Sequence, residues 1–277
     1  MFTTRLISGI VLVILALILV GQGGALLLLT SAAISCIGLF ELYRVMKMQD
    51  KLLGAVGYGA GLAYYVLLWC GQGQYFNLLV ISALMLFMTI YVVTFPKYGT
   101  EQVTVAFFGI FYVAVMFSYL YQTRMMTDGA FLVWLIFLSS WGCDTCAYCV
   151  GMLFGRHKLA PVLSPKKSIE GAVGGVVGAA LLGLLYGAVF GGCMAEVENP
   201  LIACPIACGI AAVISQIGDL AASAIKRNHG VKDYGHLIPG HGGVLDRFDS
   251  MLFPPPAISF ALTFLGWFPW GAAASIA

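Results

Sequence analysis

The stretch from residue 219 to residue 249 concentrates the polar side chains of an otherwise apolar chain. It reads DLAASAIKRNHGVKDYGHLIPGHGGVLDRFD. These 31 residues hold four of the 12 acids, four of the 14 Lys and Arg residues and three of the four His residues, although the chain is 61% hydrophobic and only 9% charged. Burying an unpaired charge in hydrocarbon costs several kcal/mol. This concentration of charge therefore predicts a functional site.

Two carboxylates interrupt apolar runs that are long enough to be membrane helices. Asp144 lies in the run 129–150 and Asp219 in the run 201–222. Acids at such depth mark functional sites by default, and the alternative is a structural ion pair with a nearby Lys or Arg. Both acids lie toward the carbonyl end of their helix, where the helix dipole disfavours them unless a cation compensates. A bound divalent metal ion would do so.

Helical spacing extends the Asp219 site along its helix. Ser223, Lys226 and Arg227 follow at i+4, i+7 and i+8, so they share a face with Asp219. This face presents a carboxylate, a hydroxyl and two cations to one side of the membrane.

The segment 239–249 adds groups that suit a metal-bound polyphosphate. Asp246 and Asp249 are three positions apart, so on a helical turn their carboxylates meet on one side. Hard oxygen ligands at that spacing suit Mg2+. Before them, the run Pro239-Gly-His-Gly-Gly243 allows backbone N–H groups to converge on an anion. The cations that flank this run are Lys226, Arg227 and Lys232.

A second polar segment, Ser164-Pro-Lys-Lys-Ser-Ile-Glu-Gly171, precedes the apolar run 171–192. Its Ser-Pro pair is typical of a helix N-cap and first helical residue. A helix N-terminus next to Lys166 and Lys167 is suited to an anion. The simpler alternative is that both Lys residues only anchor the cytoplasmic end of a membrane helix.

The apolar runs predict an all-α polytopic membrane protein with about nine transmembrane helices, since a spanning helix needs about 20 mainly apolar residues. The candidate runs are 4–22, 24–41, 53–71, 76–95, 103–121, 129–150, 171–192, 201–222 and 257–275. With the N-terminus in the cytoplasm, 13 Lys and Arg residues lie inside and only Arg124 lies outside. This is a strong positive-inside signal.

Two regions with different roles follow from this topology. Residues 1–128 are predicted to be a scaffold of N-terminal transmembrane helices. Residues 129–277 are predicted to be the catalytic region, with cytoplasmic loops 151–170 and 223–256. Glycines four positions apart, such as Gly183 and Gly187, predict close helix packing. The net charge of +2 is too small to suggest a nucleic-acid partner.

Buried acids for a divalent cation, several basic residues and a glycine-rich turn together predict phosphoryl or nucleotidyl transfer. Such chemistry depends on positioning and charge neutralisation rather than on a covalent nucleophile. The surrounding apolar helices indicate a lipid substrate. The string Cys143, Cys146 and Cys149 lies inside a membrane helix and is interpreted as apolar packing rather than an iron–sulfur site.

At this point the motifs resemble those of the phosphatidate cytidylyltransferase (CDP-diacylglycerol synthase) family. The resemblance is carried by Ser223-Ala-Ile-Lys-Arg227, Lys232-Asp233 and Pro239-Gly-His-Gly-Gly-Val-Leu-Asp-Arg-Phe-Asp249. The segment 164–171 is similar to a second family motif, and Asp144 with Tyr148, Gly151, Gly155 and Arg156 resembles a third. The resemblance is strongest over residues 140–253 and only general over the first 130.

The resemblance implies the reaction CTP + phosphatidate → CDP-diacylglycerol + pyrophosphate, dependent on Mg2+, with a second cation left open. The phosphatidate oxygen would attack the α-phosphorus without a strong general base. The implied metal ligands are Asp144, Asp219, Asp246 and Asp249. The implied catalytic set adds Lys226 and Arg227 to these acids. The implied phosphate and nucleotide contacts are Lys166, Lys167, Ser223, Lys232, His241, Gly242, Gly243 and Arg247.

The same resemblance implies a multi-pass protein of the inner (cytoplasmic) membrane with its active site facing the cytoplasm. Its partners would be CTP, phosphatidate and the lipid bilayer, and a homodimer is left open. An enzyme that consumes CDP-diacylglycerol is one alternative, but its Asp-Gly-x2-Ala-Arg pattern is absent. A secondary transporter is another, although transporters place acids near the midplane and show two matching halves. Neither feature is found in this sequence.

Overall fold

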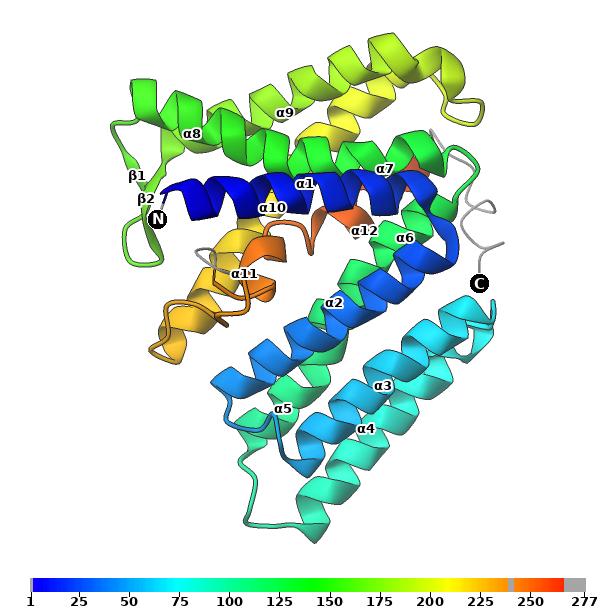
Figure 1. The fold of residues 1–277 in the computed structure, drawn as a ribbon, viewed down its shortest axis with the longest axis vertical. Helices are drawn as coiled ribbons and strands as arrows, with labels where there is room; N and C mark the ends of the chain where they lie inside the picture. The colour runs from blue at the N-terminus through cyan, green and yellow to red at the C-terminus, as the bar shows by residue number, and fades with distance from the viewer. Residues whose placement is uncertain (1, 239–241, 267–277) are drawn as a thin grey trace. The chain divides into compact units, whose positions relative to one another are not determined.

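A computed structural model describes residues 2–238 and 242–266, with side chains from residue 9 onward. Within these ranges the chain is almost entirely helical, and its elements can be followed in Figure 1. The described residues form two compact units. The first comprises residues 2–121, 229–238 and 242–248, and the second comprises residues 122–228 and 249–266.

The first unit is a group of apolar helices joined by short loops. Helix α3 packs against α2 and α4, and the Tyr43 hydroxyl donates to the Ala106 carbonyl oxygen at 2.7 Å. Its elements are α1 (Phe2–Gln22), α2 (Gly24–Val45), α3 (Leu52–Trp69), η1 (Gly73–Tyr75), α4 (Phe76–Val93), α5 (Thr100–Gly109), η2 (Ile110–Val115), the start of α6 (Met116–Met125) and α11 (Leu245–Phe248).

The second unit is built on three closely packed helices, α8, α9 and α10 (Figure 1). A Cβ added to Gly187 of α9 would lie 2.5 Å from the Pro200 carbonyl oxygen, so only glycine allows this approach. This contact agrees with the predicted packing role of the glycines. The elements are α7 (Gly129–Phe137), η3 (Leu138–Gly142), α8 (Cys143–Phe154), β1 (Lys158–Ala160), β2 (Ser164–Ser168), α9 (Ile169–Phe190), η4 (Gly191–Cys193), α10 (Pro200–Asn228) and α12 (Pro254–Phe264).

Two of the predicted membrane helices contain a π-helical segment. These segments are η2 in the run that begins at Thr100 and η3 in the run that begins at Gly129. A π segment adds a residue to the turn and rotates the helix that follows it. Asp144 lies two residues beyond η3, so its direction is set by this local rearrangement and not by uninterrupted 3.6-residue spacing.

The start of α9 differs from the sequence prediction. Residues Ser164–Ser168 form strand β2, which pairs antiparallel with β1, and the helix begins at Ile169. Ser168 is the actual N-cap, and its hydroxyl accepts a hydrogen bond from the Gly171 N–H at 3.1 Å. A residue that precedes proline favours extended backbone, so Ser164 suits a strand. Lys166 and Lys167 therefore lie on a strand and not in the first helical turn.

Seven helical segments within residues 2–238 and 242–266 are long and apolar enough to cross a membrane. They are Gly24–Val45, Leu52–Trp69, Gly73–Val93, Thr100–Met125, Gly129–Phe154, Ile169–Cys193 and Pro200–Asn228. The chain is thus a multi-pass membrane protein, while the predicted count of nine is not confirmed. Within the residues whose side chains are described, the apolar part of α1 is Gly9–Gln22. The predicted last span, 257–275, runs into residues 267–277, which lie outside the described residues.

Candidate active site

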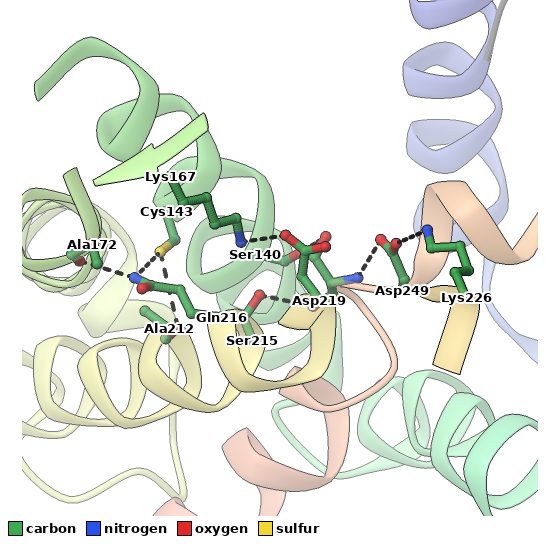
Figure 2. A network of polar contacts seen from close by, with 11 residues as sticks. Ser140, Cys143, Lys167, Ala172, Ala212, Ser215, Gln216, Asp219, Lys226 and Asp249 are labelled. Atoms are coloured by element: carbon green, nitrogen blue, oxygen red, sulfur yellow. Dashed lines mark hydrogen bonds and ion pairs between the residues drawn. The ribbon is translucent and has the colours of Figure 1, made fainter. Parts of the chain in front are cut away.

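Acidic and basic side chains of the second unit meet along the last turns of α10, as Figure 2 shows. Asp219 forms an ion pair with Lys167 of β2. Seven positions later, or about 10 Å along the helix, the Nζ atom of Lys226 lies 3.5 Å from Oδ2 of Asp249. The side chains of Lys226 and Asp249 are each only 12% exposed. The predicted polar face of α10 therefore exists, but its carboxylate and its ammonium group bind different partners.

Ser250 connects this cluster to the neighbouring elements. Its carbonyl oxygen accepts from the Ser215 hydroxyl at 2.8 Å, and its own hydroxyl accepts from Ser140 at 3.2 Å. Its N–H donates to Oδ1 of Asp249 at 2.8 Å. The Ser250 hydroxyl also lies near the Asp144 carboxylate. Residues 249 and 250 are thereby fixed against both α10 and η3.

Asp144 completes a group of three carboxylates in the second unit. It lies within electrostatic range of Lys167 and Asp219. The structure therefore brings together five residues predicted from the sequence: Asp144, Lys167, Asp219, Lys226 and Asp249. Two of these carboxylates, Asp219 and Asp249, form ion pairs with lysine ammonium groups. The ion-pair alternative considered from the sequence for Asp144 and Asp219 describes the contact of Asp219 with Lys167.

A glutamine holds the helices behind this cluster. The Gln216 side-chain N–H group donates to the Ala172 carbonyl oxygen at 2.9 Å and to Sγ of Cys143 at 3.3 Å (Figure 2). Cys143 is thus a packing and hydrogen-bonding residue between helices. Sequence analysis missed Ser215 and Gln216, although both lie within one helical turn before Asp219 and could have been found by the same spacing that selected Ser223.

In the first unit, Asp246 organises the glycine-rich loop. Its Oδ2 atom accepts hydrogen bonds from the backbone N–H groups of Tyr234 at 2.7 Å, Gly235 at 3.4 Å and Gly243 at 3.0 Å. Gly242 has φ +89°, a conformation that favours glycine. Sequence analysis predicted that the Gly243 N–H group contacts a phosphate. In the structure it donates a hydrogen bond to the Asp246 carboxylate instead.

Glu41 of α2 is the buried acid that sequence analysis missed. It is 3% exposed, and its two carboxylate oxygens accept from the N–H groups of Val244 and Leu245 at 3.0 and 2.7 Å. The signal was present, because Glu41 ends the apolar run 24–41 much as Asp144 and Asp219 interrupt theirs. It was overlooked because that run was interpreted only as scaffold.

The remaining predicted site residues differ in burial and in the element that carries them. Asp249 follows the last residue of α11, so it lies just outside the helical turn that contains Asp246. Ser223 is half-buried, and His241 lies outside the described residues. The predicted basic residues with exposed side chains are Lys166, Arg227, Lys232 and Arg247.

The carboxylates of the second unit fit Mg2+ in donor type, because hard oxygen ligands suit this ion. Their geometry is that of ion pairs: among the residues that the structure describes, no group of three or more His, Cys, Asp and Glu side chains is arranged to hold a metal ion. Lysine ammonium groups lie against Asp219 and Asp249 instead. A cation at either acid would therefore replace or join a lysine.

The pairing of Lys226 with Asp249 is testable by a double-mutant cycle. We expect Lys226→Met, Asp249→Asn and the double variant to give a coupling free energy of about 1–3 kcal/mol, because both side chains are largely buried. Thermal unfolding in detergent micelles measures it. The control is the pair His229 and Glu101, in which Nε2 lies 3.8 Å from Oε1 and the Glu101 side chain is 72% exposed. Its coupling free energy in the same cycle should stay below about 0.5 kcal/mol. Equal coupling in the two pairs would contradict the expectation.

Comparison with known proteins places this arrangement in a family. The family model for the cytidylyltransferase family matches residues 3–265. A phosphatidate cytidylyltransferase of Staphylococcus saprophyticus is 33% identical over 93% of this chain and 98% of its own length. One from Bacillus subtilis is 32% identical over 93% of this chain and 96% of its own length. The chain therefore belongs to the cytidylyltransferase family and is a nucleotidyltransferase.

Proposed function

We propose that the chain is a phosphatidate cytidylyltransferase, which converts CTP and phosphatidate to CDP-diacylglycerol and pyrophosphate at the cytoplasmic face of the membrane with the help of Mg2+. The relatives that carry this name match the chain over nearly its full length. The apolar helices around the polar cluster suit a substrate that enters from the bilayer.

The observation that carries the proposal is the pair of lysine–carboxylate contacts on α10 and its neighbours. Lys167–Asp219 and Lys226–Asp249 place two ammonium groups and two carboxylates within two turns of one membrane helix. Ammonium groups bind phosphate oxygens, and carboxylates bind the divalent ion that accompanies a nucleotide. The same cluster thus contains ammonium groups for the phosphates of a nucleotide and carboxylates for its metal ion.

The reaction requires in-line positioning more than proton transfer. An oxygen of the phosphatidate phosphate forms a bond to the α-phosphorus of CTP, and the bond from that phosphorus to the bridging oxygen breaks, so pyrophosphate leaves with its electron pair. Phosphatidate is ionised at neutral pH and needs no strong base. Lys167 and Lys226 would turn from their carboxylates to phosphate oxygens and neutralise the charge that develops on them.

The metal ligands within the second unit would be Asp144, Asp219 and Asp249. A bound Mg2+ would orient the polyphosphate and draw charge from its leaving group. Ser250 would keep Asp144 and Asp249 in place through its hydroxyl and its N–H group. The contact between Ser215 and the Ser250 carbonyl would hold this short segment against α10.

The cytoplasmic orientation rests on the charge distribution. With the N-terminus inside, 13 of the 14 Lys and Arg residues fall on the cytoplasmic side. The hairpin of β1 and β2 and the end of α10 would both face the cytoplasm, where CTP is made available. The chain would then reside in the cytoplasmic membrane, with its polar cluster at the inner surface.

The first test measures activity in detergent micelles. Pyrophosphate should be released only when CTP and phosphatidate are both present, and chelation of divalent metal should stop the release. Lys167→Met should lower kcat/KM for CTP by about 10²–10³, because it removes one positive group from the developing charge.

The control is Lys158→Met on the paired strand, where Lys158 is exposed and lies opposite Ser168. Its kcat/KM should stay within about twofold of the unmodified chain, as for most surface substitutions. Pyrophosphate release without phosphatidate would refute the proposed reaction. Wild-type turnover by Lys167→Met would instead refute the role of this lysine.

The second test concerns orientation. Cys193 is an exposed thiol in the loop 193–200, which the charge distribution predicts to lie outside, and Asn228 is an exposed residue at the end of α10. In intact cells, a membrane-impermeant maleimide should label a variant that retains only Cys193. It should label Asn228→Cys, made in a cysteine-free background, only after permeabilisation. The reverse pattern would overturn the topology.

A further inference from the structure

Glu41 is an acid that the proposed chemistry does not use, yet it lies in the wall of the glycine-rich loop. Its carboxylate is buried one turn before the end of α2. Oε1 accepts from the Val244 N–H at 3.0 Å, and Oε2 accepts from the Leu245 N–H at 2.7 Å. Both contacts reach across about 200 residues of sequence, so they join α2 directly to the start of α11.

The loop approaches Glu41 too closely for any side chain to intervene. A Cβ added to Gly235 would lie 2.1 Å from Oε1 of Glu41, and one added to Gly243 would lie 2.5 Å from the same atom. A side chain at either position would therefore displace the Glu41 carboxylate. Gly243 has a structural reason to be glycine that is independent of phosphate binding.

Two carboxylates divide the amides of this loop between them. Asp246 accepts hydrogen bonds from the N–H groups of Tyr234, Gly235 and Gly243. Glu41 accepts from those of Val244 and Leu245. Asp246 therefore joins residues 234 and 235 to Gly243, while Glu41 attaches residues 244 and 245 to α2. Arg44, one turn further along α2, adds a second attachment by donating to the Tyr234 carbonyl oxygen.

We infer that Glu41 is a positioning residue for the transfer reaction: it fixes the segment 243–247, and with it Asp246 and Arg247, to the rigid helix α2. The inference rests on the proposed function and on the roles that the family resemblance implies for Asp246 and Arg247 in that reaction, metal ligation and phosphate contact. A hydrogen bond to a charged acceptor is stronger than a neutral one, so two of them hold the segment firmly. Small displacements of positioned groups reduce turnover far more than they reduce binding.

The test replaces one carboxylate oxygen with an amide. Glu41→Gln keeps the size of the side chain but turns an NH2 group toward a backbone N–H, so one of the two hydrogen bonds is lost. The kcat per folded molecule should fall about 10- to 100-fold, which corresponds to losing one charge-assisted hydrogen bond. The KM values for CTP and phosphatidate should stay within about threefold, since substrate contacts are unchanged.

Asp128 provides a matched control in the second unit. It is also buried, at 5% exposure, and it also accepts from two backbone N–H groups, those of Ala195 at 3.1 Å and Glu196 at 2.7 Å. Asp128→Asn should leave kcat within about twofold of wild type, because its loop contributes no group to the site. An equal loss of kcat in both variants would mean that Glu41 acts only through general stability, and would overturn the inference.

A second variant covers the case in which Glu41→Gln does not fold. Arg44→Met cuts the other attachment of the loop to α2 at a half-buried position. It should lower kcat in the same direction, by about three- to tenfold, the loss of one ordinary hydrogen bond. If a folded Glu41→Gln or Arg44→Met variant keeps the wild-type kcat, the inference about Glu41 is overturned and the proposed function still stands. A wild-type chain that releases no pyrophosphate from CTP and phosphatidate overturns the proposed function and the inference with it.

Discussion

Compensation of carboxylate charge inside an apolar helical protein is the constraint on which the rest of the structure depends. An uncompensated carboxylate in such surroundings is strongly disfavoured. The structure compensates its acids in two ways. Asp246, Glu41 and Asp128 accept backbone N–H groups, whereas Asp219 and Asp249 face lysine ammonium groups.

The two kinds of compensation have different consequences. A backbone amide cannot leave its carboxylate without local unfolding, so acids held in this way fix loops in place. A lysine has a long flexible side chain, and its ammonium group can move to another anion. The lysine-paired acids are therefore the ones that can exchange a lysine for a metal ion, while the freed lysines bind phosphate. The proposed nucleotidyl transfer uses this exchange and needs no covalent intermediate.

The sequence was sufficient for the features that follow from composition and short spacing. The multi-pass helical fold follows from the apolar runs, and the close packing at Gly187 follows from small residues four apart. Asp144 and Asp219 were selected because acids are rare in such runs, and Asp249 because it lies three positions from Asp246. The grouping of Asp219 with Lys167 was not predicted, because the partners are far apart in sequence and meet only when β2 folds back beside α10.

The cap of α9, the direction of Asp144 and the contacts of Glu41 could not be predicted, because they depend on tertiary structure and not on local sequence. Two serines compete as the cap of α9, and the strand pairing of residues 164–168 selects Ser168 over Ser164. The π segment before Cys143 changes the face of the helix that carries Asp144. Glu41 was missed because its partners are backbone amides of residues 244 and 245, which no side-chain pattern reveals.

A structure determined with Mg2+ and CTP bound, in the absence of phosphatidate, tests the central claim most directly. The account predicts that the ammonium groups of Lys167 and Lys226 contact phosphate oxygens, and that Asp219 and Asp249 contact the metal ion. Both lysine–carboxylate pairs unchanged, with the nucleotide bound elsewhere, would contradict it.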